Sequence, residues 1–180
     1  AFPGKMVLAM GTSTCHILVS KKEVFLEGVA GVSKDGILPG FYGYESGQSA
    51  VGDIFAWVVN YGLPENYYYE SNKLGINLHN LLIRKCIDQL PGEHGLLALD
   101  WLNGNRSVLM NSSLSGLLIG LTLETKPEDI YRAMIEATAF GTRLIIEAYG
   151  SSKININELY ACGGLTSNEL LLQIYADITG

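Results

Sequence analysis

Two short glycine turns, each placed directly after an apolar stretch, constrain the fold of this chain more than any other feature. The first, Gly11-Thr12-Ser13-Thr14, lies between the β-compatible runs Met6–Met10 and His16–Ser20. The second, Gly163-Gly164, follows Asn157–Ala161 and leads into a helix-forming segment. Because glycine lets a chain turn sharply at a strand end, these positions predict a sheet with both turns at its strand ends.

The rest of the chain predicts an alternation of strands and helices. Val24–Val29 is expected to be a third antiparallel strand, Gly36–Tyr44 an irregular segment, Tyr67–Tyr69 a surface loop and Gly95–Leu99 a buried strand. Helices are expected over 45–61, over 72–86 with Asn72 as cap, from the capping box Thr125–Glu128 to about Ala148, and from Thr166 onward. This order predicts one α/β domain with a mixed sheet flanked by helices.

The charge balance excludes several classes of partner. The chain carries 18 acidic and 12 basic residues, a net charge of −6, whereas binding of nucleic acid needs a basic surface. The longest apolar run, Leu114–Leu121, is short and interrupted by glycine, so no membrane partner is expected. A phosphate ligand held mainly by backbone amides stays compatible with this charge.

Cysteine and histidine usage predicts a reducing compartment and no metal site. Cys15, Cys86 and Cys162 are odd in number and widely spread, and the three histidines are scattered as well. This distribution favours free thiols over disulfides or zinc. The chain opens at Ala1-Phe2-Pro3 without an initiator methionine or a signal peptide, which predicts a cytoplasmic fragment of a longer protein.

The first glycine turn is a candidate phosphate site. Glycine lets the backbone approach an anion closely, turn amides can point at the anion, and Thr12, Ser13 and Thr14 add hydroxyl donors. The alternative is an ordinary hairpin turn, in which Gly, Ser and Thr are common.

The second glycine turn is a candidate nucleoside site. The flat backbone of Gly163 and Gly164 can carry an adenine and a ribose, and Asn168 can hydrogen-bond the nucleoside. The alternative is a tight strand-to-helix connection, which also uses glycine. The segment matches neither GxGxxG nor a Walker loop, so Rossmann and P-loop sites are disfavoured.

Together the two turns resemble the two-part nucleotide clamp of actin-like ATPases. A third segment is more specific: Gly116–Leu121 followed, after seven residues, by Asp129–Glu136 matches the second sequence signature of the FGGY carbohydrate kinases at every defined position. Essentially the whole chain resembles the C-terminal nucleotide-binding domain of that family. Gly116 and Gly120 are expected to allow close helix packing, and Ala133 is expected where the helix meets the sheet.

Within this family, Met10–His16, Gly43–Asp53 and Leu99–Ser107 resemble the L-ribulokinase branch. The resemblance implies one actin-like (ribonuclease H-like) ATPase lobe, ATP and Mg²⁺ as cofactors, and transfer of the ATP γ-phosphate to L-ribulose. ATP or ADP would bind this lobe, and L-ribulose would bind together with an N-terminal lobe. Another pentulose kinase such as a xylulokinase, or a non-catalytic actin-like ATP-binding module, stays open as an alternative.

The resemblance also implies roles for single residues. The implied ATP-binding residues are Gly11, Thr12, Ser13, Thr14, Gly163, Gly164 and Asn168. Glu45 is the implied sugar-binding carboxylate, and a favourable charge at a helix start is the alternative. Gln48 is expected to be structural, and Asp53 and Asp100 are expected to be polar anchors.

No residue of this chain matches the catalytic aspartate of the family. That general base is implied upstream of Ala1, and a last helical segment is implied beyond Gly180. The lobe alone is therefore expected to bind ATP weakly and to lack kinase activity. Its exposed apolar interface leaves self-association into a homodimer open.

Overall fold

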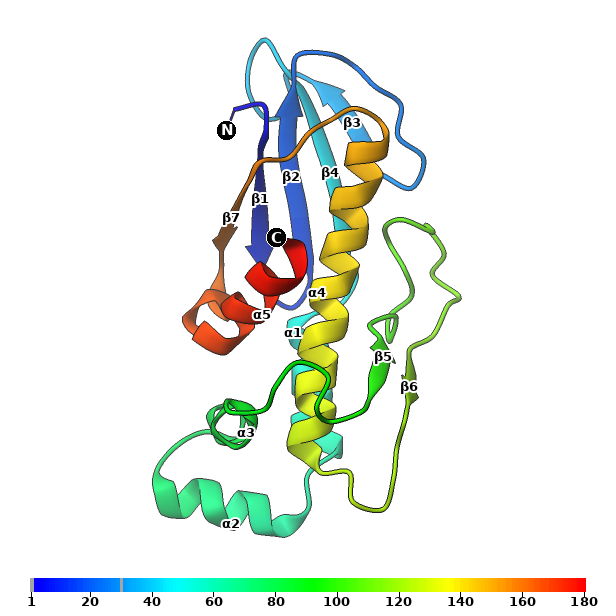
Figure 1. The fold of residues 1–180 in the computed structure, drawn as a ribbon. Coiled ribbons are helices and arrows are strands. Elements are labelled where there is room, and N and C mark those ends of the chain that lie inside the picture. The colour runs from blue at the N-terminus through cyan, green and yellow to red at the C-terminus, as the bar shows by residue number, and fades with distance from the viewer. Residues whose placement is uncertain (1, 30) are drawn as a thin grey trace.

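The computed structural model describes residues 2–29 and 31–180 and contains one five-stranded sheet. The strand order is β3-β4-β2-β1-β7, in which β7 runs parallel to β1 and the other neighbours are antiparallel. The sheet therefore has the predicted mixed character, with its early strands joined by hairpins and β7 added after a crossover (Figure 1). The strands are β1 (Lys5–Met10), β2 (Thr14–Ser20), β3 (Gly31–Lys34), β4 (Tyr42–Gln48) and β7 (Glu158–Cys162).

Five α-helices and a small β-ribbon surround this sheet. The helices are α1 (Gly52–Tyr61), α2 (Glu65–Leu74), α3 (Leu78–Cys86), α4 (Pro127–Ser151) and α5 (Glu169–Thr179), with a 3₁₀ turn at Gly164–Ser167. The ribbon pairs β5 (Leu97–Leu99) with β6 (Leu117–Ile119) and packs on α4. No helix in the described ranges is long and apolar enough to cross a membrane.

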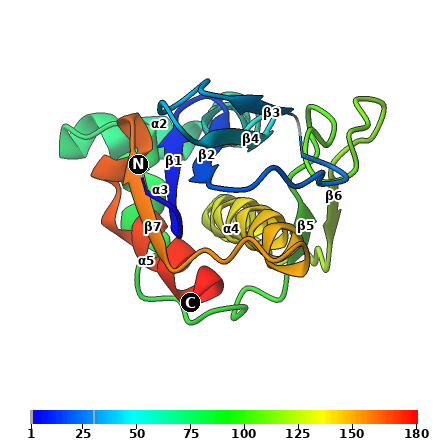
Figure 2. The same ribbon diagram turned by 90° about the horizontal axis from the view of Figure 1, so that it is seen from above.

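The core lies between the sheet and the pair α4–α5, which cover the same face (Figures 1 and 2). Alternate residues of β1, namely Met6, Leu8 and Met10, are buried, while Lys5, Val7 and Ala9 are only half-buried. Each buried aliphatic side chain contributes about 1.5–3 kcal/mol relative to exposure. The alternation therefore fixes which face of β1 points to the helices.

The long helix α4 is present, as the sequence predicted, but its two ends differ from the prediction. Thr125 was expected as the cap, yet its hydroxyl accepts a hydrogen bond from the backbone N–H of Thr122 at 2.9 Å. Asp129 instead accepts from the N–H of Lys126 at 2.8 Å, and the helix begins at Pro127. Gly150 was expected to end the helix, but it is helical, and the C-cap is Ser152.

The strand following β2 was predicted in the wrong place. The segment Val24–Val29 is not a strand, because the Val24 N–H donates to the hydroxyl of Tyr44 at 2.7 Å instead of joining a ladder. The strand β4 lies where an irregular segment and a helix start were predicted. Glycine has a low strand propensity, so the glycines of β4 do not predict a strand. Gly43 is needed because Ile37 packs against it: a Cβ there would lie 2.6 Å from the Ile37 Cδ1 atom.

Two further predictions about the helical region were wrong. Tyr67–Tyr69 lies within α2, not in a loop, because Tyr67 is buried and bonds to Glu128 of α4. The next helix is capped by Asn77 instead of Asn72: the Asn77 Oδ1 atom accepts from the N–H of Asn80 at 2.8 Å.

The FGGY signature packs differently from the prediction. Gly116 and Gly120 flank strand β6 and do not belong to a helix. A Cβ on Gly116 would lie 2.4 Å from the Leu102 Cδ1 atom, and one on Gly120, whose φ is +97°, would lie 2.3 Å from the carbonyl oxygen of Gly95. These glycines therefore close the β5–β6 ribbon. Ala133 of α4 is buried, with 2% of its surface exposed. Its expected position at the junction of helix and sheet stays a prediction.

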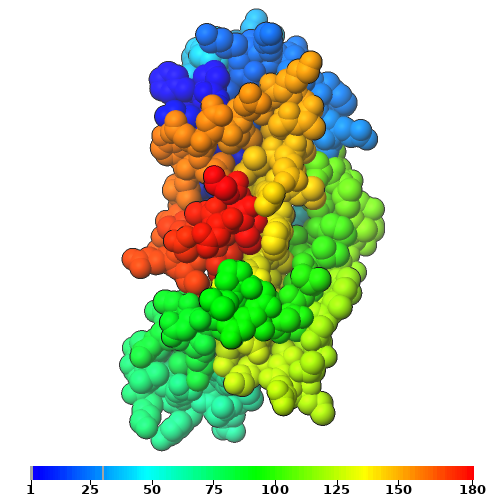
Figure 3. All heavy atoms as spheres, in the orientation of Figure 1, coloured from blue at the N-terminus to red at the C-terminus, as the bar shows by residue number. Residues whose placement is uncertain are grey.

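Figure 3 shows the face of the molecule that carries α4 and α5. The end of α5 lies directly above the segment around residues 90–100, with α4 beside both. A cavity of about 300 Å³ lies at this junction, lined by Pro91, Leu96, Phe140, Ile174 and Ile178 among others.

Candidate functional site

The two glycine turns lie next to each other at the carboxyl ends of two neighbouring strands. Strands β1 and β7 are parallel neighbours, with Ala9 opposite Cys162, so Gly11 and Gly163 both follow strand ends at the same edge (Figure 1). A Cβ on Gly163, whose φ is +104°, would lie 2.2 Å from the carbonyl oxygen of Met10. The predicted juxtaposition of the two turns is therefore confirmed, and Gly163 is the residue that permits it.

The first turn uses its carbonyl groups to begin helix α1. The Thr12 carbonyl accepts from the N–H of Val51 at 2.7 Å, and the Gly11 carbonyl accepts from the N–H of Gly52 at 3.0 Å. Within the described ranges, the N–H and hydroxyl groups of Thr12 and Ser13 bond to no acceptor. The Gly11 N–H donates to the Ser13 carbonyl at 2.9 Å, so the free donors of this turn are those of Thr12 and Ser13. Free N–H and hydroxyl donors on a turn are what an anion requires.

Thr14 differs from the other residues of the first turn. Its side chain is fully buried, and its hydroxyl has no hydrogen-bond partner among the described residues. It therefore lies on the core side of the strand, whereas Thr12 is exposed and Ser13 half-buried. An ATP contact of the Thr14 hydroxyl stays a prediction.

The second turn presents open backbone followed by a capped helix. A Cβ on Gly164 would meet no atom within 4 Å, so this glycine borders open space. Asn168 caps α5: its Oδ1 atom accepts from the N–H of Leu171 at 3.1 Å. The helix expected from Thr166 onward begins at Glu169 instead, because the Thr166 hydroxyl donates to the carbonyl of Gly163 at 2.7 Å within the 3₁₀ turn. The Asn168 amide Nδ2 has no acceptor among the described residues and is available for a ligand.

A buried network of polar side chains lies next to the first turn, where Gln48 of β4 pairs with Thr14. Gln48, at the end of β4, donates from Nε2 to Asp100 Oδ2 at 2.6 Å and to the Thr138 carbonyl at 2.8 Å. Its Oε1 atom accepts from the hydroxyl of Thr142 at 2.9 Å, and that hydroxyl also lies 3.1 Å from His16 Nε2. The expected structural role of Gln48 and anchoring role of Asp100 agree with this geometry.

Burial sets the charge state of this network. Burial, helped by the positive charge of Arg106, lowers the pKa of His16 to about 3, so the imidazole is neutral at neutral pH. Burial also raises the pKa of Asp100, against the opposing effect of its hydrogen bond from Gln48. The network links β2 and β4 to α4, and its polar atoms bond to one another within the core.

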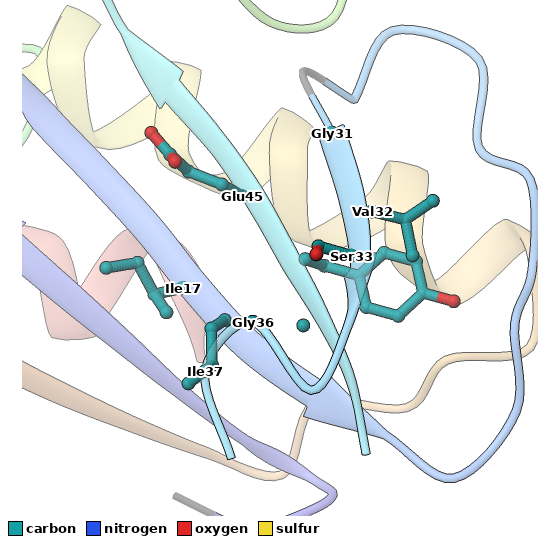
Figure 4. A pocket seen from close by; sticks show the side chains of 9 residues that line it. Ile17, Gly31, Val32, Ser33, Gly36, Ile37 and Glu45 are labelled. Atoms are coloured by element: carbon teal, nitrogen blue, oxygen red, sulfur yellow. The ribbon is translucent and has the colours of Figure 1, made fainter. Parts of the chain in front are cut away.

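Glu45 lies on the opposite face of the same strand. Its Oε1 atom accepts from Arg106 Nη2 at 2.6 Å, and about half of its side chain is exposed. Because Glu45 belongs to β4, the alternative interpretation as a charge at a helix start is wrong. Figure 4 shows its carboxylate pointing away from Val32 and Ile37, the neighbours with which it lines a cavity of about 260 Å³.

Sequence reasoning missed the role of the loop after β5. Arg106 contacts Glu45 and also donates from Nη1 toward Cys15 Sγ at 3.9 Å, while Ser107 Oγ accepts from the N–H of Gly47 at 3.1 Å. Arg106 also borders a cavity of about 310 Å³ lined by Ser49, Asn105, Met110 and Ser112. The Asn105-Arg106-Ser107 run was part of the family resemblance, but its contact with β4 depends on the tertiary fold.

The described residues offer little for a metal ion. They contain no group of three or more His, Cys, Asp or Glu side chains arranged to bind a cation. Asp53 is exposed at the start of α1, where its N–H lies 3.3 Å from the Thr12 carbonyl.

Comparisons with known proteins agree on one family. A ribulokinase from Anoxybacillus flavithermus is 60% identical over 178 residues, which cover 98% of this chain and 32% of that protein. A ribulokinase from Halalkalibacterium halodurans is 58% identical with the same coverage. The chain thus spans about a third of the length of these relatives.

A solved structure shows the same fold. The xylulose kinase from Rhodospirillum rubrum superposes with a TM-score of 0.84 at 21% identity, over 99% of this chain and 34% of that one. Kinases of that type have the actin-like ATPase fold, so the predicted fold class is confirmed. The model of the FGGY family of carbohydrate kinases, C-terminal domain, matches residues 6–180. Because this match covers nearly all of the chain, the chain belongs to the FGGY family of carbohydrate kinases.

Proposed function

We propose that residues 1–180 form the C-terminal nucleotide-binding domain of a cytoplasmic, ATP-dependent L-ribulokinase of L-arabinose catabolism. One observation carries the proposal: the two glycine turns lie side by side at the ends of neighbouring strands, and the N–H and hydroxyl donors of Thr12 and Ser13 have no acceptor among the described residues. The high identity to ribulokinases supports L-ribulose as the acceptor.

The first turn would hold the terminal phosphates of ATP. The free donors of Thr12 and Ser13 are short, fixed groups on a turn that is anchored to the start of α1. Donors fixed in this way stabilise the charge of a transferring phosphoryl group without reorganisation during the reaction. Gly11 lets the backbone approach the anion closely, and Thr14 holds the turn to the core.

The second turn would hold the nucleoside. The open surface at Gly164 accepts a flat base, and Gly163 keeps this surface against the end of β1. Asn168 would donate from Nδ2 to the nucleoside while its Oδ1 atom caps α5. The two turns together then place the γ-phosphate at the sheet edge next to β4.

Glu45 would accept hydrogen bonds from hydroxyl groups of the acceptor sugar. Its carboxylate is half-exposed, and an ionised carboxylate is an acceptor with two oxygens. The aspartate that removes the proton from the acceptor hydroxyl, and most of the sugar pocket, would belong to a part of the protein outside this chain. Mg²⁺, when bound, neutralises phosphate charge during transfer.

Two variants of the full-length enzyme test the nucleotide site. Thr12→Ala removes one charge-assisted donor, worth about 1.5–3 kcal/mol, and is expected to raise the ATP KM about 10- to 150-fold. Gly164→Val fills the space proposed for adenine and is expected to weaken ATP similarly. Both variants are expected to leave the L-ribulose KM within about twofold.

Ser151→Ala is the matched control, because it removes an exposed hydroxyl at the far end of α4 (Figure 1). Unchanged ATP kinetics in both site variants would overturn the nucleotide site. Comparing L-ribulose with D-xylulose as acceptor tests the substrate: faster turnover of D-xylulose would replace the proposed sugar.

A further inference from the structure

The ion pair between Glu45 and Arg106 is held by more contacts than its small expected contribution to stability explains. The side chains of Arg106 and Glu45 are 36% and 50% exposed, and an ion pair at such exposure adds little to stability. Even so, two further contacts fix the loop that carries Arg106: its Nη1 atom reaches Cys15 Sγ, and Ser107 Oγ bonds the N–H of Gly47.

The strand is also shaped to receive the guanidinium. A Cβ on Gly47 would lie 3.2 Å from Arg106 Nη1 and 2.6 Å from the carbonyl oxygen of Thr14. Gly47 therefore allows both the close pairing of β4 with β2 and the approach of Arg106 to the strand. The guanidinium has a planar fork of donors, so anchoring at Cys15 fixes the direction of its bond to Glu45.

One oxygen of Glu45 remains free in this arrangement. Arg106 Nη2 bonds to Oε1 at 2.6 Å, whereas Oε2 meets no donor within residues 2–29 and 31–180. An ionised carboxylate is acceptor-only, so a free oxygen can accept from a ligand hydroxyl. The pair thus presents one oriented acceptor, and Arg106 in turn lines a cavity with Ser49 and Asn105.

We propose that Arg106 is a positioning residue for the acceptor sugar, which holds the Glu45 carboxylate so that Oε2 accepts sugar hydroxyls. This inference rests on the proposed function of Glu45 as the sugar-binding carboxylate. Arg106 acts through Glu45, so its effect on the sugar disappears once the carboxylate is gone.

A double-mutant cycle in the full-length kinase tests this coupling. Arg106→Met removes the charge and the fork while keeping the length of the side chain, and it is expected to raise the L-ribulose KM about 10-fold. Glu45→Gln is expected to raise it at least as much. The double variant is expected to match Glu45→Gln alone, and the ATP KM is expected to stay within about twofold throughout.

Two further variants separate positioning from charge and from folding. Arg106→Lys keeps the charge but not the fork, and is expected to recover only part of the L-ribulose affinity. Lys5→Met breaks the Lys5–Glu158 pair, whose side chains are 36% and 51% exposed, at the opposite edge of the sheet. This matched control is expected to leave both KM values unchanged.

The outcomes distinguish the inference from the function on which it rests. Additive effects of the two substitutions, or an equal rise of the ATP KM in Arg106→Met, would overturn the positioning role. An effect of Arg106→Met with no effect of Glu45→Gln overturns it as well. If the enzyme phosphorylates another sugar and the cycle for that sugar is still non-additive, the substrate assignment fails while the role of Arg106 stands.

Discussion

Strand β4 carries a polar cluster on each of its two faces, and the two clusters differ in burial. On the inner face, Gln48 joins Asp100, Thr142 and His16 in a network of buried hydrogen bonds. On the outer face, only three residues away, Glu45 meets Arg106 in a half-exposed pair. A polar group that is buried must be satisfied internally, whereas a half-exposed one can exchange partners with water or a ligand.

We expect this difference to separate fold stability from ligand binding along a single strand. The inner network uses every hydrogen-bonding atom of the Gln48 side chain within the protein, so its loss is expected to cost folding free energy. The outer pair keeps a carboxylate oxygen free, so its loss is expected to affect ligand binding. Substitutions on the two faces can test this division directly.

The largest effect is expected for Gln48→Leu. The substitution removes the Gln48 donor from the buried Asp100 carboxylate and the Gln48 acceptor from the Thr142 hydroxyl. It is expected to lower the free energy of unfolding by about 3 kcal/mol. Urea denaturation followed by circular dichroism measures this change. A loss below about 1 kcal/mol would show that the inner network does not stabilise the fold.

A smaller effect is expected for Gly141→Ala in α4. The new Cβ would lie 2.6 Å from Gln48 Nε2 and 2.9 Å from Asp100 Oδ2, and three hydrogen bonds prevent Gln48 from moving aside. The expected destabilisation is about 1–3 kcal/mol. Gly150→Ala in the same helix, where a Cβ meets no atom within 4 Å, is the control and is expected to stabilise by about 0.5–1 kcal/mol.

The next effect is a dependence of stability on pH through His16. Its folded pKa of about 3 lies below its ordinary value of 6.5, so the unfolded chain binds a proton that the folded chain rejects. The contribution of His16 to stability is therefore complete above pH 6.5 and is lost as the pH falls toward 3. The loss is expected to reach about 1.5 kcal/mol between pH 6.5 and pH 5.

Asp100 acts in the opposite direction, because its raised pKa favours the fold at low pH and loses that contribution as the pH rises. His16→Gln isolates the histidine, since it removes the titration while glutamine can still bond to Thr142. Urea titrations of both proteins at pH 7, 6 and 5 should show the steeper decline in the protein with His16. Parallel curves would contradict the assignment.

The smallest effect on stability is expected on the outer face. Glu45→Gln is expected to change the free energy of unfolding by less than about 0.5 kcal/mol, because the pair is half-exposed. Thermal unfolding of this variant beside Gln48→Leu makes the comparison within one strand. A loss for Glu45→Gln as large as for Gln48→Leu would remove the distinction between the two faces.

The sequence by itself determined the elements whose signals are local. The Gly11 and Gly163 turns, strands β1 and β7, and the long helix α4 were all predicted close to their observed positions, because turn residues, alternation and capping act within a few residues. The family signature likewise predicted the fold class. For the candidate site, this was sufficient to name both turns of the proposed nucleotide clamp.

Only the tertiary structure decided the elements whose residues are selected by distant partners. Strand β4 was missed because Gly43 and Gly47 lower strand propensity. The tertiary structure gives the reason for these glycines: a Cβ would lie 2.6 Å from Ile37 Cδ1 at Gly43 and 2.6 Å from the Thr14 carbonyl oxygen at Gly47. Arg106 reaches Glu45 across 61 positions of sequence, a separation at which local patterns carry no information. Packing against a partner, and not propensity, therefore determined the sheet strand and the ion pair that complete the site.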